Sequence, residues 1–360
     1  MRIGLIAPPW LPVPPPAYGG TEAVVDRLAR GMQAAGHQVV LFTTGDATCP
    51  VDRRWVFERA QAPRMGEAVA ELRHLVHAYD ALASCDVVHD HTVVGPAYAE
   101  RLPALPVVTT NHGPFDRELL DVYRAVAHRV PIIAISHAQA ATARGLPLAG
   151  VIHHGIDLDH FPMGDGGGEH LLFLGRMTPD KGAEQAIAVA RRAGVPLLLA
   201  AKMREPAERR YFEERVRPLL GPGVDYVGEV GGADKCELLA GAVALLNPIQ
   251  WDEPFGLVMI EALACGTPVL ATARGAAPEI VDHGVTGFLG TEDDLVAATG
   301  RLGDLDRTAC RAAVAERFST TRMVEAHLDL FARMLAARDA GRRAVSRDRR
   351  PASAVPAGRR

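Results

Sequence analysis

Two apolar runs of strand length, separated by one helix, open the chain and leave it few possible folds. The runs are residues 2–7 (RIGLIA) and 37–44 (HQVVLFTT), and the helix is predicted to begin just after Gly19 and Gly20. A strand, a helix and a strand in this order pack as a parallel βαβ unit. The same order restarts at residues 170–175 (HLLFLG), so we predict an α/β chain with two Rossmann-like, parallel-sheet domains.

A glycine-rich segment, PMGDGGGE, divides these two halves and is typical of a flexible join. With 360 residues, the chain can form two domains that each bury a core. We predict an N-terminal domain over residues 1–162, a second domain over 163–320, and a helix over 321–337 that returns to the first domain. Residues 338–360 have few apolar side chains to pack, so a disordered basic tail is expected there.

Composition excludes several classes of protein. The net charge of −4 includes eight arginines and two aspartates in residues 338–360, so the rest of the chain is more acidic than the total and does not suit nucleic acid. The five cysteines are scattered without a CxxC pair, which favours a reducing compartment. The apolar run at the start of the sequence is too short for an export signal, and no apolar run is long enough to span a membrane. We expect a cytoplasmic protein and leave a peripheral membrane contact open.

The loop before the first helix contains Gly19 and Gly20 but not a GxGxxG motif, so NAD is not expected. The two glycines expose backbone amides that can approach a phosphate closely. The alternative is that they form a simple junction between loop and helix.

Two glutamates, Glu253 and Glu261, stand eight residues apart around a predicted helix start. Pro254 favours an extended Glu253, so the helix should begin between Phe255 and Leu257. Side chains on a helix lean toward its N-terminus, which directs Glu261 back to the same place. The free amides of Gly256 and Leu257 and the helix dipole favour an anion there. We predict a diphosphate site with one glutamate on each side.

The run EPFGLVMIEALACGTPV, which begins at Glu253, resembles the Glu-x7-Glu signature of the retaining nucleotide-sugar glycosyltransferases of family four, which have the GT-B fold. The resemblance extends from residue 1 to about 335. It implies two domains that face each other across a cleft, with Glu253 on the donor sugar and Glu261 on the ribose. Phe255, Gly256 and Leu257 would also bind the donor, for which a UDP-sugar is favoured. No separate cofactor is implied.

Two cations follow the strand at residues 170–175. Arg176 ends it, and Thr178 and Pro179 are predicted to start a helix that carries Lys181 on its first turn. A cation in that position opposes the helix dipole unless an anion binds beside it. The resemblance likewise implies that Arg176 and Lys181 neutralise the diphosphate and that Gly19 and Gly20 close over it. Alternatively, Asp180 forms a surface pair with Lys181.

Histidines follow three short apolar runs at residues 86–91, 106–113 and 131–137. The carboxyl ends of parallel strands share one edge, so we expect His89, His91, His112 and His137 to converge there. They lack a ligand spacing such as HExxH, and no metal site is predicted. By its place in NHGPF, His112 resembles the family histidine beside the donor sugar and would support catalysis.

Two further segments are singled out near the predicted site. His154 stands before Gly155 where the family usually has asparagine, which leaves the role of this side chain open. Arg274, Gly275 and Glu279 are expected to form a second loop at the same rim, with Gly275 as a backbone contact for an anion.

The resemblance implies metal-independent transfer with retention of configuration, in which the leaving phosphate helps to remove the proton of a hydroxyl acceptor. No spaced DxD motif is present to hold a metal. The segments PPPAYGGTE and NHGPF resemble the branch of this family that includes a glycosyltransferase of avilamycin-type antibiotic assembly. A glycan, lipid or secondary metabolite is therefore expected as acceptor. Three alternatives remain: a sugar-nucleotide epimerase, a pyridoxal-dependent phosphorylase and a non-catalytic sugar-binding protein. The sequence specifies neither the sugar nor the base.

Overall fold

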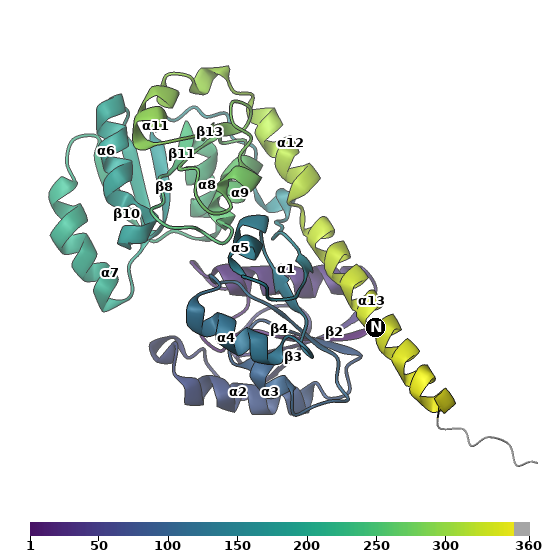
Figure 1. Cartoon of the computed structure of the whole chain (residues 1–360). Coiled ribbons are helices and arrows are strands. Elements are labelled where there is room, and N and C mark those ends of the chain that lie inside the picture. The colour runs from purple at the N-terminus through teal and green to yellow at the C-terminus, as the bar shows by residue number, and fades with distance from the viewer. Residues whose placement is uncertain (349–360) are drawn as a thin grey trace, which may run out of the picture.

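The computed structural model describes the backbone of residues 1–348 and the side chains of residues 1–340 (Figure 1). It contains two separate sheets in which every pairing of neighbouring strands is parallel. The prediction of an α/β chain with two Rossmann-like domains is confirmed.

The first sheet has the strand order β3-β2-β1-β4-β5-β6-β7. Its strands are β1 (Arg2–Ile6), β2 (Gln38–Thr43), β3 (Asp52–Trp55), β4 (Val87–Asp90), β5 (Val107–Thr110), β6 (Ile132–Ala134) and β7 (Leu148–Val151). The helices of this half are α1 (Gly20–Ala34), α2 (Ala68–Ala81), α3 (Gly95–Ala99), α4 (Arg117–Val126) and α5 (His137–Thr142).

The second sheet has the order β10-β9-β8-β11-β12-β13. Its strands are β8 (Leu171–Arg176), β9 (Leu197–Lys202), β10 (Val224–Gly228), β11 (Ala244–Asn247), β12 (Val269–Ala271) and β13 (Gly287–Leu289). The helices are α6 (Ala183–Ala193), α7 (Pro206–Tyr211), α8 (Gly232–Gly241), α9 (Leu257–Ala264), α10 (Ala277–Ile280), α11 (Glu292–Thr299) and α12 (Arg307–Arg317).

In each sheet the strand order reverses beside the first strand of that domain. The reversal lies between β1 and β4 in the first sheet and between β8 and β11 in the second. Loops that leave the carboxyl ends of such neighbouring strands diverge to opposite faces of the sheet and leave a crevice where ligands bind. The fold therefore places the two crevices where the candidate site is expected.

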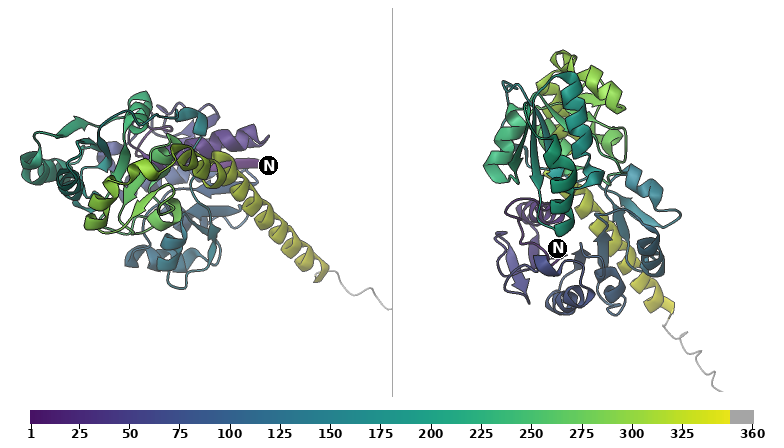
Figure 2. Two further views of the ribbon diagram at one scale, coloured as in Figure 1. Left: turned by 90° about the horizontal axis from the view of Figure 1, so that it is seen from above. Right: turned by 90° about the vertical axis from the view of Figure 1, so that its left-hand side faces the viewer.

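The last helix, α13 (Thr320–Asp348), joins the two halves. It follows α12 of the second domain and runs along the first domain, as the views in Figure 2 show. Met323 and Phe331 of α13 are buried in one core with Ile3 of β1 and Leu28 of α1. On α1, a Cβ atom at Gly31 would lie 2.6 Å from the Val324 side chain, so a glycine is needed for this close packing.

The return of the last helix to the first domain follows the prediction, but its predicted end at residue 337 is wrong. Helix α13 continues to Asp348, because residues 338–348 are rich in alanine and arginine, both of which favour a helix. The rest of the tail predicted to be disordered, residues 349–360, lies outside the described residues. Within the described chain, no helix combines the length and apolarity that crossing a membrane requires.

Candidate active site

A cleft of about 2050 Å³ lies between the two domains. Its lining comes from loops at the carboxyl ends of strands in both sheets and from the first turns of α1 and α9. Every residue predicted for catalysis or donor binding lines this cleft: Gly19, Gly20, His112, Arg176, Lys181, Glu253, Phe255, Gly256, Leu257 and Glu261. The fold therefore brings these residues together around one cleft.

Helix α9 begins at Leu257, within the predicted limits, because Gly256 adopts a left-handed conformation with a φ of 94°. A Cβ atom at Gly256 would lie 2.5 Å from the Met259 side chain. Another glycine supports the loop from behind: a Cβ atom at Gly275 would lie 2.3 Å from the carbonyl oxygen of Glu253, which accepts a hydrogen bond from the amide of Ala276 at 3.0 Å.

The predicted second rim loop therefore has a different role. Arg274, Gly275 and Glu279 are not among the residues that line the cleft. The expectation that Gly275 contacts an anion stays a prediction; in this structure its backbone packs against that of Glu253.

The carboxylate of Glu253 is held by two side chains. It pairs with the Nζ atom of Lys181 and accepts a hydrogen bond from the indole nitrogen of Trp251 at 3.0 Å. The Lys181 ammonium also lies 5.3 Å from the centre of the Trp251 ring, a cation–π distance. The alternative in which Asp180 pairs with Lys181 is not realised, since Asp180 lies 3.8 Å from Arg176.

Lys181 lies on a helical turn that begins after Thr178, as predicted, but this turn is separate from helix α6. Pro179–Lys181 forms a single 3-10 turn, and Gly182 ends it in a left-handed conformation with a φ of 80°. Helix α6 then begins at Ala183. Only a glycine fits here, because a Cβ atom at residue 182 would lie 2.1 Å from the carbonyl oxygen of Pro248. Lys181 thus lies just before the helix and reaches across to Glu253.

Glu261, on α9, is buried between two cations that the sequence analysis missed. Lys235 of α8 contacts its carboxylate at 2.8 Å, and Arg27 of α1 lies 3.8 Å from it across the domain boundary. One signal could have identified Arg27: it lies seven residues after Gly20, which places both on the same face of α1.

The N-termini of α1 and α9 approach each other from opposite domains. A Cβ atom at Gly20 would lie 3.5 Å from the side chain of Leu257. Both ends have free amides and the positive end of a helix dipole, which together favour an anion. Glu22, in the first turn of α1, is buried, and this burial raises the pKa of its carboxyl group to about 7.

A row of buried imidazoles leads from the cleft into the first domain. His91 Nδ1 lies 2.8 Å from His112 Nε2, and His112 Nδ1 lies 3.3 Å from His154 Nε2. The ring of His89 lies 4.0 Å from that of His91 and 5.0 Å from that of His327 on α13. We call these five residues the histidine row.

Burial lowers the pKa of every member of the histidine row, to about 3 for His112 and about 4 for His327. The imidazoles are therefore neutral at pH 7. A neutral ring has one N–H donor and one acceptor nitrogen, so the two neighbours of His112 use both of its nitrogens.

The expected convergence of four histidines is thus only partly right. His89, His91 and His112 meet as predicted, but His137 does not join them. It begins α5, where its backbone amide donates to Glu279 at 2.9 Å, and its ring lies 5.7 Å from that of His153. The strand that precedes His137 is farther along the sheet, so its end opens onto a different part of the domain boundary.

Comparison with known proteins assigns this two-domain arrangement to the glycosyltransferases. The model described as Glycosyltransferase Family 4 matches residues 18–160, and the one described as Glycosyl transferases group 1 matches residues 168–304. Together they cover more than three quarters of the chain, which belongs to this glycosyltransferase family and is an enzyme with the GT-B fold.

Its relatives have several activities. The chain is 28% identical over 351 residues to a phosphatidyl-myo-inositol mannosyltransferase of Mycolicibacterium smegmatis, covering 89% of this chain and 88% of the relative. It is 27% identical to an alpha-maltose-1-phosphate synthase of Mycobacterium tuberculosis, covering 88% and 92%.

Solved structures show the same fold over nearly the whole chain. A glycosyltransferase involved in avilamycin A biosynthesis has a TM-score of 0.70 and 28% identity, with 93% of this chain and 98% of that chain covered. Sucrose-phosphate synthase from Thermosynechococcus elongatus has a TM-score of 0.78 and 24% identity, with 93% and 99% covered.

Proposed function

We propose that the enzyme transfers a sugar, with retention of configuration, from a nucleoside diphosphate sugar to a hydroxyl group of an acceptor. The observation that carries this proposal is the cluster of Arg176, Lys181 and the α9 amides in the cleft, with Glu253 and Glu261 on either side. Positive groups on one side of a sugar site can hold a diphosphate, while carboxylates beside them accept hydrogen bonds from sugar and ribose hydroxyls.

The charges fit the departure of a nucleoside diphosphate. Cleavage of the bond to the sugar develops negative charge on the phosphate oxygen and positive charge on the anomeric carbon. Arg176, Lys181 and the amides of Gly256 and Leu257 would stabilise the first charge without a metal. The neutral imidazole of His112 is compatible with the positive charge on the anomeric carbon, because a protonated ring would repel that carbon.

Retention would follow if the acceptor approached from the face that the diphosphate leaves. Glu253 and Glu261 are both engaged with lysines, so neither of these two is free to act as a nucleophile as it stands. We propose that the departing phosphate oxygen accepts the proton of the acceptor hydroxyl.

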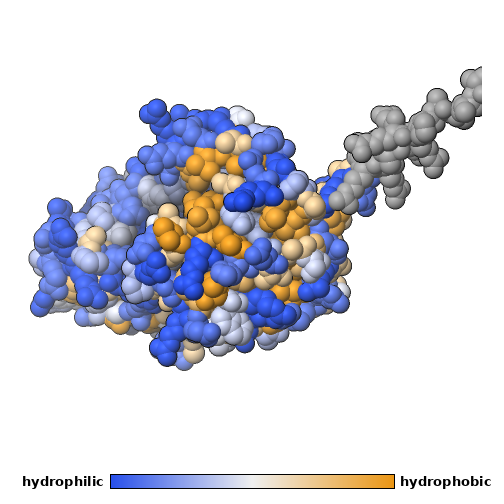
Figure 3. All heavy atoms as spheres, turned by 90° about the horizontal axis from the view of Figure 1, so that it is seen from below, coloured by the Kyte–Doolittle hydropathy of each residue, from blue (hydrophilic) through white to orange (hydrophobic). Residues whose placement is uncertain are grey.

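The acceptor would bind on the N-terminal side of the cleft. Met65, Val93 and Val122 line this side and are partly exposed. Figure 3 shows further apolar surface on the lower face of the molecule, which is turned away from the gap between the domains. An acceptor with an apolar part, a lipid or a secondary metabolite, fits this lining better than a wholly polar one. The names of the mannosyltransferase and avilamycin relatives include both types of compound.

The test is a panel of UDP-, GDP- and dTDP-sugars incubated with alcohol-bearing acceptors, with products identified by mass spectrometry and their anomeric configuration by NMR. We favour UDP as the first nucleotide; Anabaena HepE, a fold neighbour at 19% identity, has been solved with UDP-glucose. Conversion of the donor sugar to its epimer without an acceptor would instead support the epimerase alternative. Inversion of the anomeric centre would contradict the mechanism.

Arg176→Ala and Lys181→Ala should each lower turnover by about 10²-fold or more, the scale of one preorganised charge contact. Arg192→Ala serves as the control, since Arg192 is an exposed arginine that pairs with Asp293 on the surface. Normal turnover in both cleft variants would remove this account of the leaving group.

A further inference from the structure

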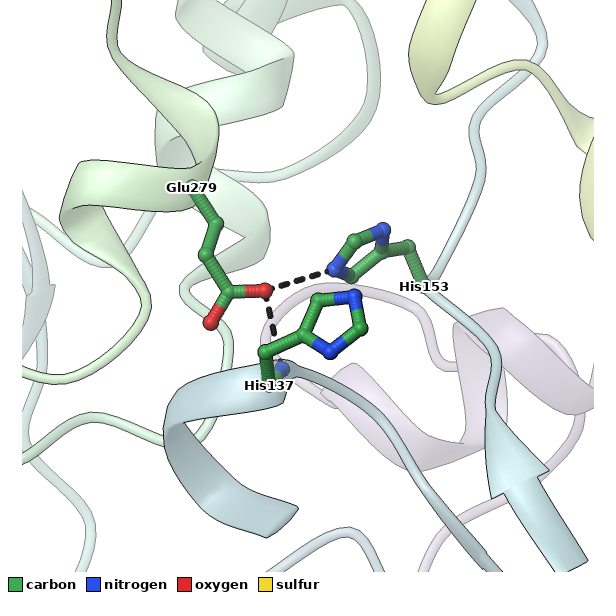
Figure 4. A group of neighbouring side chains, drawn as sticks. All are labelled: His137, His153 and Glu279. Carbon is green, nitrogen blue, oxygen red and sulfur yellow. Dashed lines mark hydrogen bonds and ion pairs between the residues drawn. The ribbon is translucent and has the colours of Figure 1, made fainter. Parts of the chain in front are cut away.

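Three potential metal ligands meet outside the cleft, at the boundary between the domains (Figure 4). His137 begins α5, His153 follows β7 by two residues, and Glu279 lies in α10 of the second domain. One nitrogen of each ring and one carboxylate oxygen all lie within 4.8 Å of one another. None of the three residues lines the cleft.

The surroundings hold two of these side chains in place. The carboxylate of Glu279 accepts hydrogen bonds from the amides of His137 and Ala138 at 2.9 and 2.6 Å and from His153 Nε2 at 2.8 Å. Burial alone would raise the pKa of Glu279, but these hydrogen bonds lower it below its ordinary value, so the group is a carboxylate at neutral pH. The rings of Phe255 and Phe318 pack against His153 at 5.8 and 5.6 Å.

We propose that His137, His153 and Glu279 bind a divalent zinc ion that links the two domains. Two imidazoles and one carboxylate are a donor set that zinc accepts, with a water molecule in the fourth position. Zinc–ligand bonds of about 2.0–2.1 Å place tetrahedral ligands roughly 3.4 Å apart. The exposed His137 side chain can make the small approach needed. Hydrogen bonds to a ligating carboxylate, as Glu279 has here, are typical of metal sites.

The ion would replace the proton that now lies between His153 Nε2 and Glu279. The ring would then carry its proton on Nδ1 and present the Nε2 lone pair to zinc. Arg317 donates a hydrogen bond to the backbone carbonyl oxygen of Glu279, and its charge is balanced by Asp282 at 2.7 Å.

The competing explanation is a hydrogen-bonded contact without any metal. A substitution of His137 distinguishes this explanation from a zinc site. The backbone amide of His137 donates to Glu279, whereas its ring makes only an edge contact with the ring of His153 and is free to bind a metal. His137→Ala keeps the amide and suits a helix, but removes one ligand. His128→Ala is the matched control, because His128 is an exposed histidine of the same domain.

The experiment uses the full chain after treatment with a chelator. Zinc chloride is titrated by calorimetry, and Tm is measured with and without the metal. We expect one zinc ion per chain and a rise in Tm for the wild type and His128→Ala, with affinity about tenfold or more weaker in His137→Ala. Magnesium should have no effect, since this donor set suits zinc.

Equal zinc affinity in the wild type and His137→Ala would overturn the proposal, as would the absence of binding. Neither result depends on glycosyl transfer, because the readouts are binding and stability.

Discussion

His154 contacts the catalytic candidate His112 from the segment that joins the two domains. The rings are nearly parallel, with centres 5.2 Å apart, and Phe255 packs against His154 at 5.1 Å. Asparagine, which the resemblance predicts at this position, is shorter and cannot fill the same volume. We therefore predict that His154 positions the ring of His112.

Replacement of His154 by Asn should lower kcat by about tenfold and change KM little, because a displaced catalytic side chain affects the transition state more than donor binding. Steady-state kinetics would measure both constants. His77→Asn is the control, since His77 lies on the exposed face of α2. A lower affinity for donor with unchanged kcat would contradict the positioning role.

At the scale of the elements, the glycines at the two ends of α6 allow two effects to be compared: backbone strain alone, and backbone strain together with a steric clash. Gly182 and Gly194 both have left-handed backbones, with φ values of 80° and 69°. A Cβ atom at Gly182 would collide with Pro248, whereas one at Gly194 would meet open space.

Gly194→Ala should therefore lower the free energy of unfolding by about 1–2 kcal/mol, the cost of a left-handed residue with a side chain. Gly182→Ala should cost more and should also weaken nucleoside diphosphate binding, because the turn that carries Lys181 has to shift. Urea unfolding and calorimetry with UDP would check both. Equal effects of the two substitutions would show that the contact with Pro248 is unimportant.

The histidine row connects two strand ends with α13 and should make the fold sensitive to acid. Burial lowers the pKa of these residues in the folded state, so the unfolded chain binds more protons below pH 6.5. The free energy of unfolding should then fall as the pH decreases from about 6.5 toward 4, by at most about 1.4 kcal/mol per pH unit for each histidine.

Urea unfolding between pH 7.5 and pH 5 would measure this slope, and His327→Phe should reduce it because one titrating group is removed. An unchanged slope in that variant would mean that other groups control acid stability.

The sequence predicted the elements well where one local signal determined them. Apolar runs identified strands such as β1, β2, β4 and β8, and Pro254 with Gly256 placed the start of α9, but β3 was missed because its sequence, DRRW, is not an apolar run. The sequence did not predict features that depend on tertiary contacts. One example is Gly182, which separates the turn of Lys181 from α6 and packs closely against Pro248. The partners of Glu261 and the grouping of His137 with Glu279 depend on how the domains meet, which no local pattern contains.

At the scale of the whole molecule, α13 makes the stability of one domain depend on the end of the chain. Phe331 of α13 is fully buried in the core of the first domain. A terminal helix was expected to return there, but the sequence did not show which side chains it would bury.

Phe331→Ala should lower the free energy of unfolding by about 3–5 kcal/mol, the usual cost of removing a large buried ring. Thermal unfolding would measure the loss. Arg333→Ala, an exposed change on the same helix, is the control. A loss below 1 kcal/mol would show that α13 adds little to that core.

The facing starts of α1 and α9 have a consequence for the timing of catalysis. Each directs the same sign of partial charge at the gap, so the two halves repel each other slightly until a double phosphate neutralises both ends. The donor would thereby act as its own signal for closing, and water would be shut out only when there is a sugar to deliver.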